Sequence, residues 1–75
     1  MNDLVKVRKA WRLLGTVFTH NRKQWYYMKL WNVPRKNANK AKKIAKEEGF
    51  EASIVPGNAT LYDRRDRCNC IIRVS

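Results

Sequence analysis

Aromatic side chains crowd the segment WYYMKLW at residues 25–31. In a strand, alternation would place Tyr26, Met28 and Leu30 on one face. The opposite face would then carry a row formed by Trp25, Tyr27, Lys29 and Trp31. Bases of single-stranded nucleic acid stack on exposed rings of this kind, and each stacked base contributes about 1–3 kcal/mol. The pattern therefore indicates a stacking platform, provided that this face is open to solvent.

The N-terminal segment offers a cover for the same face. Leu4, Val7 and Trp11 recur at helical spacing and Asp3 is a candidate N-cap, so we expect a short helix there. If this helix packs on the tryptophan-bearing face, the rings belong to the core, where large aromatic side chains are often found. A competing interpretation of the N-terminal segment makes residues 10–19 a strand with alternating side chains.

Lysine and arginine dominate the segment RKNANKAKKIAKEEG at residues 35–49. It is rich in helix formers and its alanines share one face, which predicts a helix over about residues 35–48. Gly49 suits the left-handed position that ends a helix, and Phe50 can fold back on the last turn. The side chains of this helix that we expect to contact phosphate are Arg35, Lys36, Lys40 and Lys43.

The charges of this predicted helix run against its macrodipole. Cations lie toward its start, whereas Glu47 and Glu48 lie at its end, and each such placement costs about 0.3–1 kcal/mol when exposed. Folding stability alone favours the opposite order, so we expect a polyanionic ligand at the start of the helix, where free N–H groups also suit phosphate. The alternative is a merely solvated lysine-rich face.

Positive charge is concentrated in the first two-thirds of the chain. Seventeen Lys and Arg against six Asp and Glu give a formal charge of +11, of which residues 1–46 carry +12 and residues 47–75 carry −1. Such an excess repels itself in a compact body, which indicates a polyanionic partner, either DNA or RNA. The remaining candidate phosphate contacts are Arg8, Lys9 and Arg12 in the first segment and Arg22 and Lys23 in a turn.

The residues that could do catalytic chemistry do not assemble into a site. His20 is the single histidine and is expected at an exposed turn. Cys68 and Cys70 alternate along one predicted strand, which is unfavourable for a bridge between them, and the further ligand pair of a structural zinc site is missing. We therefore expect no enzyme, no cofactor and no metal, with both thiols reduced.

Taken in chain order, the predicted helices and strands indicate a single α+β domain covering residues 1–75. The runs LLGTVFTH and WYYMKLWNV are predicted to form a hairpin around NRKQ. The strands EASIV and CNCIIRV are expected after the long helix, with ATLYD as a further candidate strand and DRRDR as a turn. A small antiparallel sheet of three to five strands should pack on one main helix, in the order (α)ββαβ(β)β. The sequence does not determine the strand order. If the C-terminal strand lies at an edge, it could pair with a second copy, so the protein would be a monomer or a homodimer.

Residues 25–74 resemble the half-unit of peptidoglycan-binding, sporulation-related (SPOR-type) domains, through a strand, the stretch NANKAKKIAKEEGFEASIV and a closing strand. This pattern is a generic βαβ arrangement, and we assign no family from it. The sequence signatures of RRM, KH, zinc-finger and helix-turn-helix modules do not match either. The chain has no apolar run near the roughly 20 residues that span a bilayer and no apolar stretch typical of a secretory signal, which predicts a cytoplasmic protein without a membrane partner.

Charge and aromatic content together predict a non-enzymatic nucleic-acid-binding module. Lys and Arg would contact phosphates, and the aromatic strand face would stack bases. The alternative is a small inhibitor or adaptor of phage type, of the anti-CRISPR or host-takeover class, that binds an acidic protein surface or the nucleic-acid channel of a nucleoprotein complex. Both functions use the same basic surface, so the sequence alone does not separate them.

Overall fold

The computed structural model describes residues 3–21, 26–56 and 67–74 of the chain. Its elements follow the order α, β, β, α, β, β: α1 (Leu4–Arg12), β1 (Thr16–Asn21), β2 (Tyr26–Pro34), α2 (Arg35–Glu47), β3 (Ala52–Pro56) and β4 (Arg67–Arg73). This order confirms the predicted α+β class and selects the N-terminal helix over a strand starting at residue 10. The segment ATLYD, predicted as a strand, lies outside the described residues. The predicted turn DRRDR also lies outside them except for its last residue, Arg67, which begins β4.

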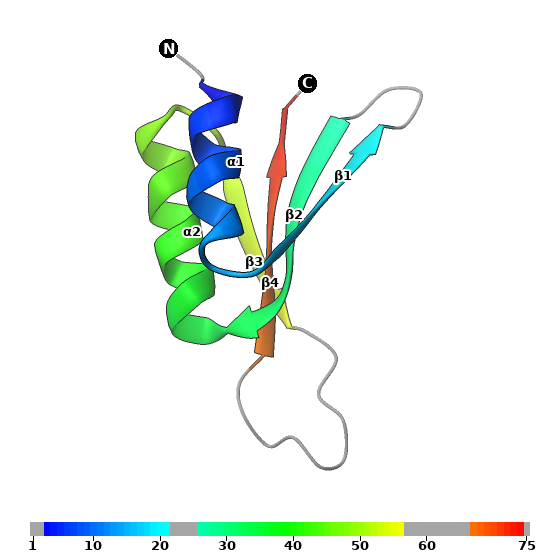
Figure 1. The fold of residues 1–75 in the computed structure, drawn as a ribbon, viewed down its shortest axis with the longest axis vertical. Helices are drawn as coiled ribbons and strands as arrows, with labels where there is room; N and C mark the ends of the chain where they lie inside the picture. Colours follow the sequence, from blue (N-terminus) through cyan, green and yellow to red (C-terminus); the bar gives the residue numbers. More distant parts are fainter. Residues whose placement is uncertain (1–2, 22–25, 57–66, 75) are drawn as a thin grey trace.

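The described strands form one antiparallel sheet in the order β1-β2-β4-β3 (Figure 1). The C-terminal strand β4 lies between β2 and β3, so it is not an edge strand that could pair with a second copy. The physical reason is burial: β2 and β4 contribute the fully buried Met28, Leu30, Cys70 and Ile72, so they belong at the centre of the sheet. The edges of the sheet are β1 and β3.

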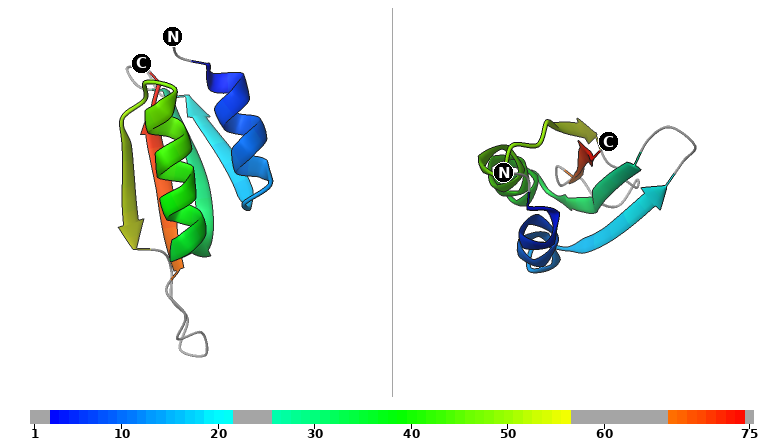
Figure 2. Two further views of the ribbon diagram at one scale, coloured as in Figure 1. Left: turned by 90° about the vertical axis from the view of Figure 1, so that its left-hand side faces the viewer. Right: turned by 90° about the horizontal axis from the view of Figure 1, so that it is seen from above.

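Both helices pack on one face of this sheet, as the side and end views of Figure 2 show. Val7 and Trp11 of α1 and the alanines Ala38, Ala41 and Ala45 of α2 join the buried side chains of β2 and β4 in a single core. Cys68, Cys70 and Ile72 point into this core as alternation predicted, and Val74 packs at its edge. The opposite face of the sheet carries no described helix.

Trp11 ties α1 to α2. Its ring is fully buried, and its Nε1–H donates a hydrogen bond of 3.1 Å to the carbonyl of Ala41 in the middle of α2. A buried indole needs such an acceptor, because an unpaired buried donor costs about 1–3 kcal/mol. The bond therefore fixes where α1 crosses α2.

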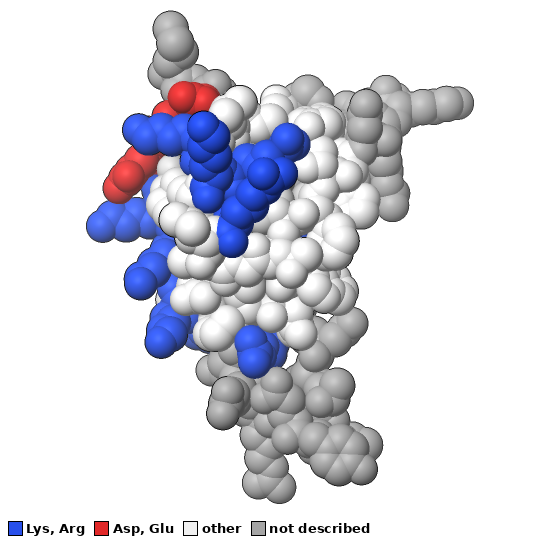
Figure 3. Space-filling model, viewed as in Figure 1, with Lys and Arg blue, Asp and Glu red and all other residues white. Residues whose placement is uncertain are grey.

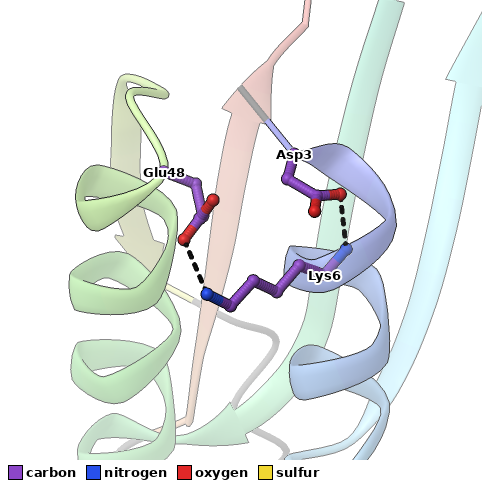
Figure 4. Close-up of polar contacts among 3 residues, drawn as sticks. All are labelled: Asp3, Lys6 and Glu48. Carbon is purple, nitrogen blue, oxygen red and sulfur yellow. Dashed lines mark hydrogen bonds and ion pairs between the residues drawn. The ribbon is translucent and has the colours of Figure 1, made fainter. Parts of the chain in front are cut away.

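Charged groups join the N-terminal end of α1 to the C-terminal end of α2 (Figure 4). Asp3 is the N-cap of α1, as predicted, and its side chain accepts a 3.1 Å hydrogen bond from the Lys6 amide. The Lys6 ammonium lies 3.3 Å from the carboxylate of Glu48, directly after α2. Because the Lys6 side chain is 69% exposed, this ion pair adds little stability but it neutralises one of the few acids near the helices.

The end of α2 is the predicted Schellman ending. Gly49 adopts a φ of 88°, which is the left-handed region that glycine favours. The Phe50 amide donates to the Ala45 carbonyl at 3.0 Å and the Gly49 amide to the Lys46 carbonyl at 3.0 Å. Phe50 is buried, so the reversal directs the chain from α2 into β3 against the core.

A β-bulge in β2 sets which residues face outward. Leu30 pairs with Cys70 and Val33 pairs with Cys68, so Trp31 and Asn32 together lie opposite Asn69. Asn32 takes a φ of 49°, and its amide donates a 2.6 Å hydrogen bond to Oδ1 of Asn69. Without the extra residue Val33 would face away from the core; with it, Trp31 stays on the outer face while Val33 is buried.

We expect Gly15→Ala to destabilise the protein, because Gly15 packs directly on β2. An added Cβ would lie 2.5 Å from Cγ1 of Val33, a buried side chain with little freedom to move. Overpacking of this kind costs about 1–3 kcal/mol, measurable by urea unfolding. The matched control is Ser53→Ala at an exposed strand position, which should stay within about 0.5 kcal/mol of the wild type; equal stability of the two variants would contradict the close packing at Gly15.

Candidate functional site

The predicted binding residues divide between two surfaces on opposite sides of the molecule. The first, called here the basic helix surface, is formed by the solvent-facing cations of α1 and α2: Lys6, Lys9, Arg12, Arg35, Lys36, Lys40, Lys43 and Lys46. The second, called the open sheet face, is formed by alternate residues of the four strands that point away from both helices: Thr16, Phe18, His20, Tyr27, Lys29, Trp31, Ser53, Val55, Asn69, Ile71 and Arg73.

The basic helix surface holds most of the positive charge of the chain. Four of the seventeen Lys and Arg lie in α1 and six in α2, against a single acid, Glu47, within the two helices. In α2, helical periodicity puts the buried alanines on one side and leaves the exposed cations around the other. Figure 3 shows this gathering of blue side chains over the helices, with acidic side chains at one end.

A shallow depression lies on the solvent side of α2. Its volume is about 510 Å³ and its lining consists of Asn39, Lys42, Lys43, Lys46 and Glu47. These side chains recur at three- and four-residue spacing, so they line one stripe of the helix. Three ammonium groups on such a stripe create a field that attracts phosphate oxygens.

The charge order of α2 is the one predicted from the sequence. Its first turn contains Arg35 and Lys36 and no acid, and no side chain caps its N-terminus. At the other end Glu48 pairs with Lys6, which compensates part of its unfavourable position near the helix C-terminus. The positive end of the α2 dipole and the cations of its first turn therefore both make the electrostatic potential at the start of the helix more positive.

Arg8 is placed differently from the other cations of α1. Its Nη2 donates hydrogen bonds to Oγ1 of Thr19, at 3.0 Å, and to the hydroxyl of Tyr26, at 3.4 Å. These bonds join α1 to the β1–β2 hairpin on the covered face of the sheet. Arg8 therefore has a positioning role in the structure, and Lys9 and Arg12 are the exposed members of the predicted set in this helix.

The open sheet face carries the predicted aromatic row. Tyr27, Lys29 and Trp31 lie on it, and α1 lies on the other side, packed against α2 and β1 (Figure 2). The interpretation in which the N-terminal helix covers these rings is therefore wrong. The apolar stripe of α1 fits the same side of the sheet as α2 because Trp11 reaches the Ala41 carbonyl there. Trp25, at the start of the predicted row, lies outside the described residues, as do Arg22 and Lys23.

Trp31 already has partners on this face. The ammonium of Lys29 lies 4.7 Å from the centre of the Trp31 ring, and Phe18 meets the ring edge-on with centroids 6.3 Å apart. An exposed cation–π contact contributes about 0.5–1 kcal/mol, whereas a stacked base contributes about 1–3 kcal/mol. The contact between Lys29 and Trp31 is therefore weaker than the stacking that an aromatic ring can provide for a flat ligand.

Phe18 and His20 also belong to this face, although neither was among the site residues predicted from the sequence. His20 pairs with Tyr27 and Phe18 pairs with Lys29, so both lie beside the predicted row. Phe18, His20, Lys29 and Trp31 surround a hollow of about 380 Å³. The alternation in LLGTVFTH groups Thr16 with Phe18, but only the register of β1 against β2 places them next to Trp31. His20 is exposed as expected, within strand β1 rather than in a turn.

Side chains that could bind a metal ion do not gather in the described part of the chain. Among residues 3–21, 26–56 and 67–74 no group of three or more His, Cys, Asp or Glu side chains could hold a metal ion. Cys68 and Cys70 are free thiols buried in the core. Burial raises the pKa of Cys70 to about 12, and the nearby Lys42 ammonium opposes this shift only in part. A thiol that stays protonated is a poor nucleophile. Over the described residues, no helix combines the length and apolar character that crossing a membrane requires.

The raised pKa of Cys70 predicts a loss of stability in alkali. Folding keeps this thiol neutral, so its contribution is complete below the ordinary pKa of 9.0 and disappears as the pH rises toward about 12. The unfolding free energy of the wild type should therefore fall more steeply over this range than that of Cys70→Ala, in which only the other titrating groups remain. Parallel pH profiles in urea unfolding would contradict the assignment.

Comparisons of this chain with protein-family models, with curated proteins and with solved structures give no significant match. The two surfaces themselves therefore provide the evidence for a function.

Proposed function

We propose that this protein is a nucleic-acid-binding module that holds the phosphate backbone of DNA or RNA on its basic helix surface. The observation that carries the proposal is the collection of ten Lys and Arg in two adjacent helices that contain one acid. Charges scattered around the fold would have served solubility equally well. Their concentration on one layer creates the field that a polyanion requires.

The chemistry of these side chains favours backbone contacts over sequence-specific ones. Lys36, Lys40 and Lys43 are exposed ammonium groups on flexible stems, which suit phosphates but lack the rigid fork that reads a base edge. The cations at the start of α2 lie at the positive end of its dipole, so both attract anions. Binding should therefore depend strongly on salt and weakly on base sequence.

A second candidate function is docking on an acidic protein surface, as expected for an inhibitor or adaptor. One observation favours it: Val5 on α1 and Leu13 at its C-cap are 63% and 89% exposed, near Lys9 and Arg12. Apolar side chains between cations suit a partner that combines an apolar patch with acidic groups. Absence of duplex binding at low salt would select this candidate over the first.

The test of the first proposal is the salt dependence of duplex DNA binding. We expect Lys36→Gln, Lys40→Gln and Lys43→Gln, combined in one variant, to weaken binding and to reduce the slope of log K against log salt by about 0.9 for each phosphate that the variant no longer neutralises. Fluorescence anisotropy at several salt concentrations measures this slope. Because all three side chains are exposed, the thermal unfolding of the variant should remain close to that of the wild type.

A charge-matched control separates local contact from net charge. Arg64→Gln, Arg65→Gln and Arg67→Gln, combined, remove the same number of charges from a segment outside both helices. This variant should retain most of the wild-type slope. Equal slopes for both variants would show that the duplex does not contact α2 in particular, and the placement of the site on the basic helix surface would be withdrawn.

A further inference from the structure

We infer that the open sheet face is a second site, which stacks the bases of single-stranded nucleic acid and is separate from the phosphate-binding basic helix surface. This inference rests on the proposed function, because it assumes that nucleic acid is the partner. It adds the strandedness of the ligand and a set of residues that phosphate binding does not use.

Four ring-bearing side chains meet on two neighbouring strands. Phe18 and His20 of β1 and Tyr27 and Trp31 of β2 surround Lys29, through the pairs Phe18↔Lys29 and His20↔Tyr27. No described helix covers them, and Phe18 keeps 44% of its surface exposed. The hollow beside them, about 380 Å³, lies within the usual size range of small-ligand sites, about 300–1,000 Å³.

The charges of this face favour a nucleotide over the other occupants. Lys29 lies among the rings, and the hollow that it lines with Phe18, His20 and Trp31 has no acid in its described lining. Glu51 lines a separate hollow with Tyr27, Ser53, Ile71 and Arg73, so Tyr27 is the ring of this set that borders the carboxylate. A phosphate next to a base stacked on Trp31 or Phe18 would meet Lys29 rather than an acid. In a face-to-face pair of two copies, the Lys29 and Arg73 cations of one copy would approach those of the other, and the residues described for this face include no acid, so like charges oppose such pairing.

The ligand must be single-stranded, because the bases of a duplex are already stacked on their neighbours. A duplex presents its phosphates to the protein and so suits the basic helix surface. An unpaired strand presents flat base surfaces, which aromatic side chains accept with little dependence on sequence. Since the two surfaces lie on opposite sides of the sheet, they can hold separate segments of nucleic acid at the same time (Figure 2).

The experiment compares two short ligands of equal charge by amide NMR at about 0.15 M salt, where the Debye length is about 8 Å. One is a tetrathymidylate and the other is the matching abasic oligomer, which keeps the phosphates and lacks the bases. We expect the abasic oligomer to shift the amides of α2 alone and the tetrathymidylate to shift those of β1 and β2 as well. Each site then reports its own dissociation constant.

Substitutions assign the response to the rings. Phe18→Ala should weaken the tetrathymidylate binding reported by β1 and β2 about five- to 150-fold and leave the constant reported by α2 unchanged. The matched control, Leu13→Ala, removes an even more exposed apolar side chain from the helix layer and should change neither constant. Because Phe18 is partly exposed, its removal should leave the fold intact, and Trp31→Phe, which keeps a ring, should retain most of the binding.

Other outcomes of these measurements would contradict base stacking on the open sheet face. Equal shifts of β1 and β2 with the abasic oligomer, or an unchanged constant in Phe18→Ala, would overturn base stacking while the α2 response leaves phosphate binding standing. Shifts of β1 and β2 that depend on protein concentration without any oligomer would identify the face as an interface between copies, which also overturns it. No response to either oligomer, together with no duplex binding, would remove both proposals.

Discussion

The packing of both helices on one face of the sheet is the constraint on which the remaining structure depends. The buried apolar side chains of the described residues form one core, and Trp11 brings α1 into that core by its hydrogen bond to Ala41. Once α1 and α2 share a side, their cations must share it too, and the other side of the sheet is left without a described helix to cover it. The same packing thus creates both the basic helix surface and the open sheet face.

Concentrating ten cations on two adjacent helices opposes folding, since like charges repel and those at the start of α2 face the positive end of its dipole. Few groups limit this repulsion. The Glu48 carboxylate pairs with Lys6, and the neutral hydroxyls of Thr19 and Tyr26 accept hydrogen bonds from Arg8. The compensation is local and leaves α2 exposed as a cationic stripe. A bound polyanion would relieve the repulsion and stabilise the fold at the same time.

The bulge at Asn32 has a comparable influence on the open sheet face. By placing two residues of β2 opposite Asn69, it allows Trp31 to face outward and Val33 to face inward within the same strand. The hydrogen bond from the Asn32 amide to Asn69 holds this arrangement. The orientation of Trp31 beside Phe18 and Lys29 is therefore built into the strand rather than left to side-chain motion.

Local signals in the sequence are enough to predict most of the helices and strands. They are Asp3 as a cap, the alanines Ala38, Ala41 and Ala45 on one helix face, Gly49 and Phe50 at the helix end, and the alternation in CNCIIRV. The charge excess can likewise be counted without a fold. Three features could not be predicted in this way: the side of the sheet that α1 covers, the place of β4 inside the sheet, and the positions of Phe18 beside Trp31 and of His20 beside Tyr27. These depend on strand register and on contacts between residues far apart in the chain, such as Trp11 with Ala41, which periodicity does not encode.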